Sequence, residues 1–422
     1  MKVVIVGGVA GGASLAARLR RLDENAQIVM FERGSYISFA NCGLPYYIGG
    51  IITDRDELLL QTPESMGARF DVDVRINSEV VGIDRAAKTV QVKSGGETYS
   101  ESYEVLALSP GSSPIVPKME GVDSDKVMKL WTIPDMDKIA AAAKGAKSAV
   151  VIGGGFIGVE MAENLTHAGL DVILIEMMDQ VMPNLDFDMA QILHKHMSAK
   201  GVKLALNQGV KGIKDTDVGV TVITDRAQIS AGFAVMSIGV RPNSELAKDC
   251  GLELGERGGI VVDVSLKTSD ENIYAVGDVA QVNNFVSGEK TMIPLAGPAN
   301  KMGRMAADNI CGMNRVYKGT QGSSVVKVFD MSAASTGLNE KQLSGMGKKI
   351  NDDYRVTVLH PLNHAGYYPG GEKMCLKVIF DTDGKVLGAQ AVGGEGVDKR
   401  IDVIATAIRF GASADDLQEL EL

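Results

Sequence analysis

Two glycine-rich turns, each directly after a short apolar run, have the residue types that hold the phosphates of a dinucleotide. The second turn contains Gly153, Gly155 and Gly158 in the spacing GxGxxG. In such a motif the first glycine makes the turn, the second lets the backbone approach a pyrophosphate, and the third packs a helix against a strand. The start of that helix receives the phosphate charge. Glu176, at the end of the next apolar run, is placed to accept hydrogen bonds from an adenosine ribose, which favours NADH over NADPH.

The first turn is less regular. Gly7 and Gly12 match the motif, whereas Val9 occupies the position of the middle glycine. Glu32 closes the next apolar run, close to the spacing expected of a ribose contact. Two dinucleotide sites in one chain imply two dinucleotides. A pairing of FAD with a nicotinamide also explains a further acid after an apolar run, Asp278, which is placed to bind the ribityl chain of a flavin.

Cys42 lies in the segment SFANCGLPYYIGG, residues 38–50. Pro45, three positions later, predicts that a helix opens here. Unpaired amides and the positive end of the helix dipole would lower the pKa of the thiol and populate the nucleophilic thiolate. A free cysteine is as often a small buried apolar side chain, and the residues alone leave both interpretations open. The packing role is expected of the other three cysteines, Cys250, Cys311 and Cys375.

The composition is typical of a cytoplasmic globular enzyme. Of the 422 residues, 45% are hydrophobic and 23% are charged. The net charge of -10 argues against a nucleic-acid partner, since it leaves no basic stripe for phosphates. The sequence has no apolar run of about eighteen residues, which predicts no membrane span. The cysteines show no CxxC spacing, which suits a reducing compartment. The five histidines form no ligand-like constellation, so no metal is expected.

The elements that must position these residues follow an α/β order. The pattern strand, turn, helix, strand occurs twice, with the strands expected at 2–6, 27–31, 148–152 and 171–175, the first helix at 13–22 and the second ending near 167. A further buried strand is expected at 273–280 and a helix at 303–311. From Val325 the pattern changes to alternating strands, with a hairpin turn at Asp383-Gly384 and an amphipathic helix at 397–410.

This order predicts two nested Rossmann-like dinucleotide-binding domains and a C-terminal α+β domain suited to an interface. The expected boundaries are 1–113 with 245–324 for a discontinuous FAD-binding domain, 114–244 for an NAD(P)H-binding domain and 325–422 for a C-terminal dimerisation domain.

Taken together, the motifs resemble the single-cysteine branch of the pyridine nucleotide-disulfide oxidoreductase family, and within it the coenzyme A-disulfide reductases and NADH-dependent persulfide reductases. The likeness extends over nearly all of the chain. It rests on GGVAGG, FERG, SFANCGLPYYIGG, IGGGFIGVE, IGVRPN, AVGDVA, PLAGPANKMGR and HAGYYPGG.

The resemblance implies that Cys42 is the redox cysteine, resting as a mixed disulfide with coenzyme A or as a sulfur adduct beside the flavin. Glu160 would lie near the nicotinamide, and the amides around Leu295 and Ala296 would face the pyrimidine edge of the flavin. The residues implied to bind the two dinucleotides are Gly7, Val9, Ala10, Gly11, Gly12, Glu32, Arg33, Asn41, Val80, Ser109, Pro110, Gly111, Gly153, Gly155, Phe156, Ile157, Gly158, Glu160, Glu176, Gly239, Gly277, Asp278, Leu295 and Ala296.

The resemblance also implies a coenzyme A channel and a homodimer. Tyr367 would reach across the dimer to the partner's cysteine site and donate a proton or hydrogen bond to a departing thiolate. For the arginines on the first helix, a solvated surface position is the alternative. The residues implied to line the channel are Ser14, Arg18, Arg21, Ser38 and Asn41, with Asn300 and Arg304 contributed by the other subunit.

The expected activity is hydride transfer from NADH, or NADPH, to FAD and then to Cys42, whose thiolate reduces coenzyme A disulfide or a persulfide. One alternative is an NADH oxidase or peroxidase that uses a Cys42 sulfenic acid. Ala10 weakens the peroxidase interpretation, because peroxidase and oxidase members usually have a histidine there. Another alternative, from a different class, is a redox-sensing flavoprotein whose cysteine adduct controls partner binding.

Overall fold

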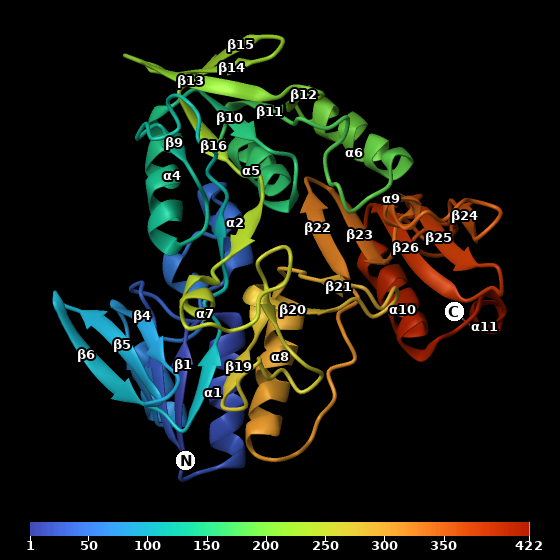
Figure 1. Cartoon of the computed structure of the whole chain (residues 1–422). Helices are drawn as coiled ribbons and strands as arrows, with labels where there is room; N and C mark the ends of the chain where they lie inside the picture. Colours follow the sequence, from blue (N-terminus) through green and yellow to red (C-terminus); the bar gives the residue numbers. More distant parts are fainter. Residues whose placement is uncertain (422) are drawn as a thin grey trace. The chain divides into compact units, whose positions relative to one another are not determined.

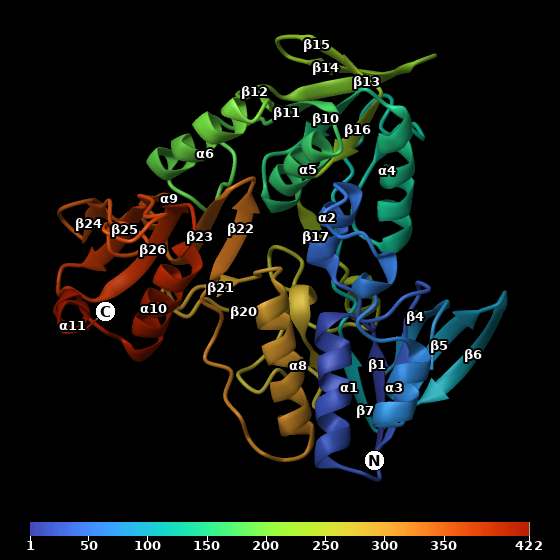
Figure 2. The same cartoon turned by 180° about the vertical axis from the view of Figure 1, so that it is seen from behind.

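The structure, a computed structural model, describes residues 1–421 and contains two compact units, each built from segments far apart in the sequence (Figure 1 and Figure 2). The predicted mixed α/β class is confirmed. The boundaries of three domains stay a prediction. The first unit comprises Met1–Asn41, Asp54–Ser113 and Val240–Thr320, and the second comprises Cys42–Thr53, Pro114–Gly239 and Gln321–Leu422.

The first unit is built on a five-stranded parallel sheet with the order β19-β7-β1-β2-β3. The central strand β1 pairs in parallel with β2 and β7. Its residues from Val3 to Ile5 are fully buried, as expected of a strand covered on both faces. The strands are β1 (Lys2–Val6), β2 (Gln27–Phe31), β3 (Val72–Arg75), β7 (Val105–Leu108) and β19 (Ile273–Ala275).

Two long helices, α1 (Ala10–Leu22) and α8 (Ala296–Ile310), pack side by side in this unit (Figure 2). They approach closely where Gly303 of α8 meets Gly11 of α1: a Cβ on Gly303 would overlap the carbonyl oxygen of Gly11. Both helices begin before the predicted positions. In α1 the residues Ala10 to Gly12 of the glycine-rich turn already have helical backbone, and α8 begins at Ala296.

Smaller elements complete the first unit. An antiparallel sheet has the order β4-β5-β6, and a second small sheet has the order β18-β20-β21. The predicted strand at 273–280 is interrupted by the 3-10 helix η3 at Gly277–Val279. The remaining elements are η2 (Arg55–Leu58), α3 (Pro63–Phe70), β4 (Ser78–Asp84), β5 (Thr89–Ser94), β6 (Glu97–Ser102), β17 (Val240–Pro242), α7 (Glu245–Asp249), β18 (Ile260–Val261), β20 (Ala280–Asn283) and β21 (Lys290–Thr291), with β8 (Ser112–Pro114) and η1 (Asn41–Gly43) at its limits.

The second unit contains another five-stranded parallel sheet, with the order β12-β11-β10-β16-β9. The predicted strands at 148–152 and 171–175 are confirmed as β10 and β11. The sheet and its helices are β9 (Val127–Met128), α4 (Ile133–Gly145), β10 (Ser148–Ile152), α5 (Phe156–His167), β11 (Asp171–Ile175), α6 (Phe187–Ala199), β12 (Lys203–Ala205) and β16 (Phe233–Met236). This unit also has α2 (Leu44–Ile48) and the sheet β13 (Val210–Thr216), β14 (Gly219–Thr224) and β15 (Gln228–Ala231).

The C-terminal part of the second unit is an antiparallel sheet with the order β22-β23-β26-β25-β24. The predicted Asp383-Gly384 turn connects β25 and β26, and the helix predicted at 397–410 is confirmed as α10. The elements are β22 (Ser324–Val328), β23 (Met331–Gly337), α9 (Glu340–Gly345), β24 (Tyr354–Leu359), β25 (Cys375–Asp381), β26 (Val386–Gly393), α10 (Val397–Phe410) and α11 (Ala414–Gln418). Among residues 1–421, no helix combines the length and the apolar character needed to cross a bilayer.

We expect Gly303→Ala to lower the free energy of unfolding of the first unit by about 1–3 kcal/mol, because its methyl group would force α1 and α8 apart. Thermal unfolding followed by circular dichroism measures this effect. The matched control is Gly145→Ala at the end of α4, where nothing lies within 4 Å of the added methyl group. Equal melting temperatures for the two variants would contradict the predicted close packing.

Candidate active site

The first glycine turn brings the start of α1 against the end of β1. Gly7 has φ of +98°, and a Cβ on it would overlap the carbonyl oxygen of Ser109. A Cβ on Gly12 would overlap the carbonyl oxygen of Gly7. Val9, at the middle position of the motif, is the N-cap of α1 and makes no side-chain cap, and Ala10 begins the helix. The first amides of α1 are therefore available to the phosphates of a ligand.

Glu32 ties the end of β2 to this turn. Its carboxylate accepts hydrogen bonds from the backbone N–H of Gly8, at 3.0 Å, and of Gly34, at 2.8 Å. The carboxylate therefore lies beside the glycine turn, as required of a group that binds an adenosine ribose.

The second glycine turn repeats this geometry in the second unit. Gly153 has φ of +106°, and a Cβ on Gly158 would overlap its carbonyl oxygen. Gly155 is the N-cap of α5, and no atom lies within 4 Å of the place where its Cβ would be. This open space lets a ligand approach the backbone, which is the role predicted for the middle glycine. Phe156 and Ile157 form the first turn of α5.

Glu176 has the same role at the second turn as Glu32 has at the first. Its carboxylate accepts hydrogen bonds from the N–H of Gly154, at 2.6 Å, and of Met178, at 2.8 Å. Gly239, with φ of +112°, follows β16 in the same unit, and its carbonyl accepts a hydrogen bond from Ile115 N–H.

Asp278 lies in η3, directly after Gly277, which has φ of +80°. Ser112 Oγ donates a hydrogen bond of 2.7 Å to its carboxylate, and burial raises the pKa of the carboxyl. A buried carboxyl beside a hydroxyl suits the hydroxyl groups of a ribityl chain. Asp278, the first glycine turn and Glu32 belong to the same unit, so their residue types fit FAD.

The remaining residues predicted to bind FAD are also in the first unit. Leu295 is the N-cap of α8 and Ala296 is its first residue, so amides of a helix start are present at the predicted position. Val80 is buried on β4, whereas Asn41 is exposed at the start of η1. The others lie on loops after strands: Arg33 after β2, and Ser109, Pro110 and Gly111 after β7.

Cys42 lies in η1, directly before the short helix α2, and is solvent-exposed and unpaired. The predicted lowering of its pKa is wrong for the protein on its own. Partial burial of the sulfur removes hydration from the thiolate and so raises the pKa of the Cys42 thiol, and the negative charge of Glu160 raises this pKa further. Helix α2 has five residues, so its dipole is small.

Glu160 belongs to a group of acids on α5 that the sequence analysis only partly found. Burial, and then repulsion from Glu163, raises the pKa of Glu160 to about 7, while a hydrogen bond from Tyr46 Oη, at 3.4 Å, opposes the shift. Burial likewise raises the pKa of Glu163 to about 7. Carboxyl groups that titrate near neutral pH can take up and release protons during a reaction. Two features of the sequence could have indicated this group: Glu160 and Glu163 lie three positions apart on one helix, and Tyr46 lies in the LPYY segment shortly after Cys42.

A pocket of about 270 Å³ in the first unit brings together four of the residues predicted for the coenzyme A channel: Ser14, Arg21, Ser38 and Arg304. The sequence analysis missed Arg69 and Phe70, which also line it. The guanidinium carbons of Arg21 and Arg69 lie 5.2 and 5.1 Å from the centre of the Phe70 ring. Three guanidinium groups and an aromatic ring suit a ligand that carries phosphates.

Two expectations for this channel need correction. Asn300 and Arg304 were expected from the other subunit, but the chain's own copies lie at this place: Ser14 Oγ donates a hydrogen bond of 2.8 Å to Asn300 Oδ1, and Arg304 lines the pocket. They are available without a partner because α8 packs along α1. Arg18 does not line the pocket and forms an ion pair of 2.7 Å with Asp308 instead.

Tyr367 is 94% exposed, in the loop between β24 and β25. Its predicted contact with the partner's cysteine site stays a prediction. Within residues 1–421, no cluster of three or more histidine, cysteine, aspartate and glutamate side chains is arranged to hold a metal ion.

Comparison with known proteins gives matches over almost the whole chain. Residues 1–303 match the family described as pyridine nucleotide-disulphide oxidoreductase, and residues 323–420 match its dimerisation domain. Two relatives are each 35% identical over 100% of this chain and 94% of their own length: an NADH oxidase of Methanocaldococcus jannaschii and a coenzyme A disulfide reductase of Staphylococcus haemolyticus.

Two solved structures have a TM-score of 0.97 over 100% of this chain. One is reduced CoADR-RHD of Bacillus anthracis, which is 50% identical and of which 76% is covered. The other is a NAD-dependent persulfide reductase of A. fulgidus, which is 38% identical and of which 79% is covered.

We expect Glu160→Gln to lower the pKa of the Cys42 thiol, because it removes the negative charge that disfavours the thiolate. The rate of alkylation of Cys42 by iodoacetamide, followed as a function of pH by peptide mass spectrometry after reduction, should reach its midpoint at a lower pH. Glu79→Gln, an exposed acid of β4, is the matched control and should leave the profile unchanged. An unchanged midpoint in Glu160→Gln would show that the carboxylate does not act on the thiol.

Proposed function

The chain belongs to the pyridine nucleotide-disulphide oxidoreductase family, and we propose that it reduces coenzyme A disulfide or a coenzyme A persulfide with electrons from NADH. The protein is a flavoprotein enzyme that binds FAD and NADH. The first glycine turn, Glu32 and Asp278 would hold FAD, and the second glycine turn and Glu176 would hold NADH. When bound, FAD accepts a hydride from NADH and supplies the electrons that release Cys42 as a thiolate.

The observation that best supports a coenzyme A substrate is the pocket with three arginines. The chain has a net charge of -10, so a ligand with several phosphates needs a local group of cations to bind. Arg21, Arg69 and Arg304 supply this group, and the buried Phe70 ring holds the guanidinium groups of Arg21 and Arg69 beside it.

The residues of the chain perform the sulfur chemistry of the proposal. The Cys42 thiolate attacks one sulfur of the substrate disulfide, the S–S bond breaks, and coenzyme A leaves as a thiolate while a mixed disulfide forms on Cys42. A proton for the leaving thiolate comes from a nearby acid. Glu160 holds a proton near neutral pH, and Tyr46 Oη donates a hydrogen bond to it. In the homodimer that the dimerisation domain favours, Tyr367 of one protomer would supply a hydrogen bond at its partner's site.

A second candidate is an NADH oxidase, because one relative of equal identity has that name. In this case the Cys42 thiolate would attack peroxide, the O–O bond would break with release of hydroxide, and the resulting sulfenic acid would be reduced to the thiol and water with electrons supplied through the flavin. Oxygen would first have to be reduced to peroxide by electrons from NADH. The exposure of the thiol is compatible with either oxidant.

The first test is stopped-flow oxidation of the NADH-reduced enzyme by coenzyme A disulfide, coenzyme A persulfide, peroxide and oxygen in parallel. We expect rapid reoxidation by one of the coenzyme A compounds alone. Cys42→Ser should retain reduction of the flavin by NADH and lose disulfide turnover, since the nucleophile is gone. Cys250→Ser is the matched control. Fast reoxidation by peroxide or oxygen would favour the oxidase, and disulfide turnover by Cys42→Ser would exclude the proposed mechanism.

We also expect Arg304→Met to raise the KM for coenzyme A disulfide about tenfold, the effect of one lost charge-assisted hydrogen bond. The KM for a small uncharged disulfide, such as hydroxyethyl disulfide, should stay the same. Arg257→Met, at an exposed position of the same unit, is the control. An equal rise in KM for both disulfides would indicate general damage to the unit and not the loss of a phosphate contact.

A further inference from the structure

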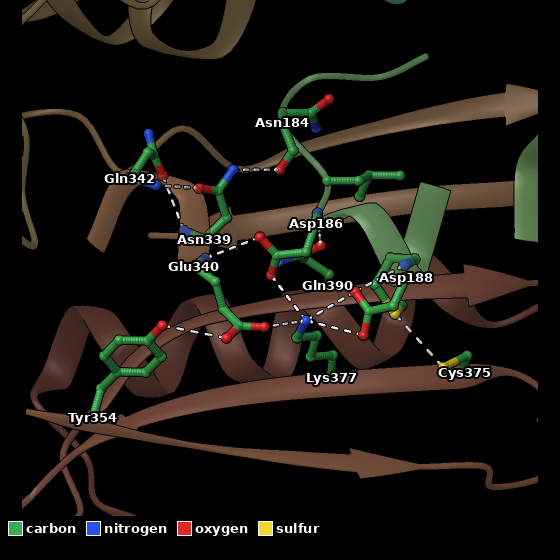
Figure 3. Close-up of polar contacts among 12 residues, drawn as sticks. Asn184, Asp186, Asp188, Asn339, Glu340, Gln342, Tyr354, Cys375, Lys377 and Gln390 are labelled. Carbon is green, nitrogen blue, oxygen red and sulfur yellow. Dashed lines mark hydrogen bonds and ion pairs between the residues drawn. The ribbon is translucent and has the colours of Figure 1, made fainter. Parts of the chain in front are cut away.

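Lys377 lies on β25 and is surrounded by acidic side chains (Figure 3). Its side chain is buried, with only 3% exposed. Its Nζ lies 2.9 and 3.0 Å from the two carboxylate oxygens of Asp188, 3.2 Å from Asp186 and 2.5 Å from Glu340. Burial lowers the pKa of Lys377, but the hydrogen bonds to Glu340 and Asp188 outweigh it and raise the pKa. A buried ammonium is unfavourable unless carboxylates surround it, so Lys377 holds these three acids in place.

Asp186 is the central acid of this group. It is the N-cap of α6, yet its side chain makes no cap to its own helix. The carboxylate instead accepts hydrogen bonds from the side-chain amide of Gln390, at 2.5 Å, and from the N–H of Glu340, at 3.0 Å. The N–H of Asp186 donates to Gln390 Oε1 at 2.6 Å. An N-cap carboxylate normally accepts a hydrogen bond from its own helix. The Asp186 carboxylate instead connects the start of α6 to the C-terminal sheet and α9.

Asn184 fastens the same stretch of chain at a second point. Its carbonyl accepts a hydrogen bond of 3.1 Å from Asn339 Nδ2, and its own Nδ2 donates to Ser335 Oγ at 2.8 Å. The residues just before α6 are therefore attached to β23, β25, β26 and α9, as Figure 3 shows for the residues it labels.

The other end of this stretch is the second glycine turn. Residues 177–185, here called the connecting segment, run from Glu176 to Asp186. Met182 N–H donates a hydrogen bond of 2.7 Å to the carbonyl of Gly154, the residue whose own N–H is bound by Glu176. The side-chain amide of Gln180 donates to three carbonyls within the segment.

Met182 has φ of +53°, an unusual value for a residue with a side chain, which persists only where the surrounding contacts impose it. The connecting segment is therefore held in one conformation by its two ends. One end is the Lys377 group, and the other is the glycine turn with Glu176.

We propose that Lys377 is a positioning residue for NADH, acting through Asp186 and the connecting segment on Glu176 and the second glycine turn. This inference rests on the proposed placement of NADH at that turn. Lys377 touches neither the dinucleotide nor the reacting atoms in this proposal. It raises the affinity for NADH because it holds the protein groups that would contact the ribose and the pyrophosphate in their binding geometry before NADH binds.

The test uses the FAD-loaded enzyme with Lys377→Met and Asp186→Asn. Asp186→Asn keeps the shape of the side chain and removes one charge, so it serves if Lys377→Met does not fold. We expect the Kd for NAD+, measured by titration calorimetry, and the KM for NADH, with ferricyanide as acceptor, to rise about fivefold in Lys377→Met and about twofold in Asp186→Asn. The kcat should stay the same. Lys385→Met, an exposed lysine in the turn between β25 and β26, is the matched control.

Hydrogen exchange gives the second readout. In both variants the amides of the connecting segment should exchange faster, whereas those of Lys385→Met should not. A folded Asp186→Asn with unchanged Kd and unchanged exchange would overturn the inference. Glu176→Ala, which removes the ribose acceptor, separates this failure from that of the proposed function: if it also leaves the Kd unchanged, the proposed placement of NADH at the second glycine turn is wrong, and the inference falls with it.

Discussion

Both nucleotide-binding halves of this protein depend on a contact that a Cβ would prevent. At Gly12 and again at Gly158, the first turn of a helix packs against the carbonyl group of the glycine that follows the preceding strand, Gly7 or Gly153. Because the helix starts there, its first amides are free of partners within the helix and face the space beyond the strand end. The position of each carboxylate at the end of the neighbouring strand follows from the same contact, since that strand pairs in parallel with the first.

This dependence explains which parts of the fold could be predicted. The strands at 2–6, 27–31, 148–152 and 171–175 are placed correctly, because buried parallel strands appear as continuous apolar runs before glycine. The helices that follow them begin earlier than predicted, since glycine signals a turn in the sequence while its backbone here is helical. Strand β23, MSAASTG, was not predicted, because its small and hydroxylated residues do not show the alternation of large apolar and polar side chains that indicates a strand. It forms through pairing with β22 and β26 on either side.

The candidate site was less predictable where it depends on contacts between distant segments. The position of Cys42 before a helix could be inferred, but the direction of its pKa could not, because Glu160 reaches it only through the packing of α2 against α5. Lys377 is a similar case. In MCLKVIF its position is that of an exposed polar residue on a strand, and only the fold brings Asp186 and Glu340 to it. The pocket residues Ser14 and Arg21 were expected from the resemblance to the family, whereas Arg69, which comes from α3, was not.

The protein is acidic overall, yet its cofactors are anions. A chain with a net charge of -10 binds FAD and NADH, so the proposed sites need local positive potential. Backbone amides at two helix starts and a small group of arginines are placed to supply it. Its carboxylates lie near these sites without opposing them, because Glu32 and Glu176 accept hydrogen bonds from the turns themselves. Each turn is thereby held in one geometry by the acid that we propose binds the ribose. Such preorganisation reduces the conformational entropy lost on binding, and at the second turn the buried Lys377 group extends the same constraint from the ligand site into the C-terminal sheet.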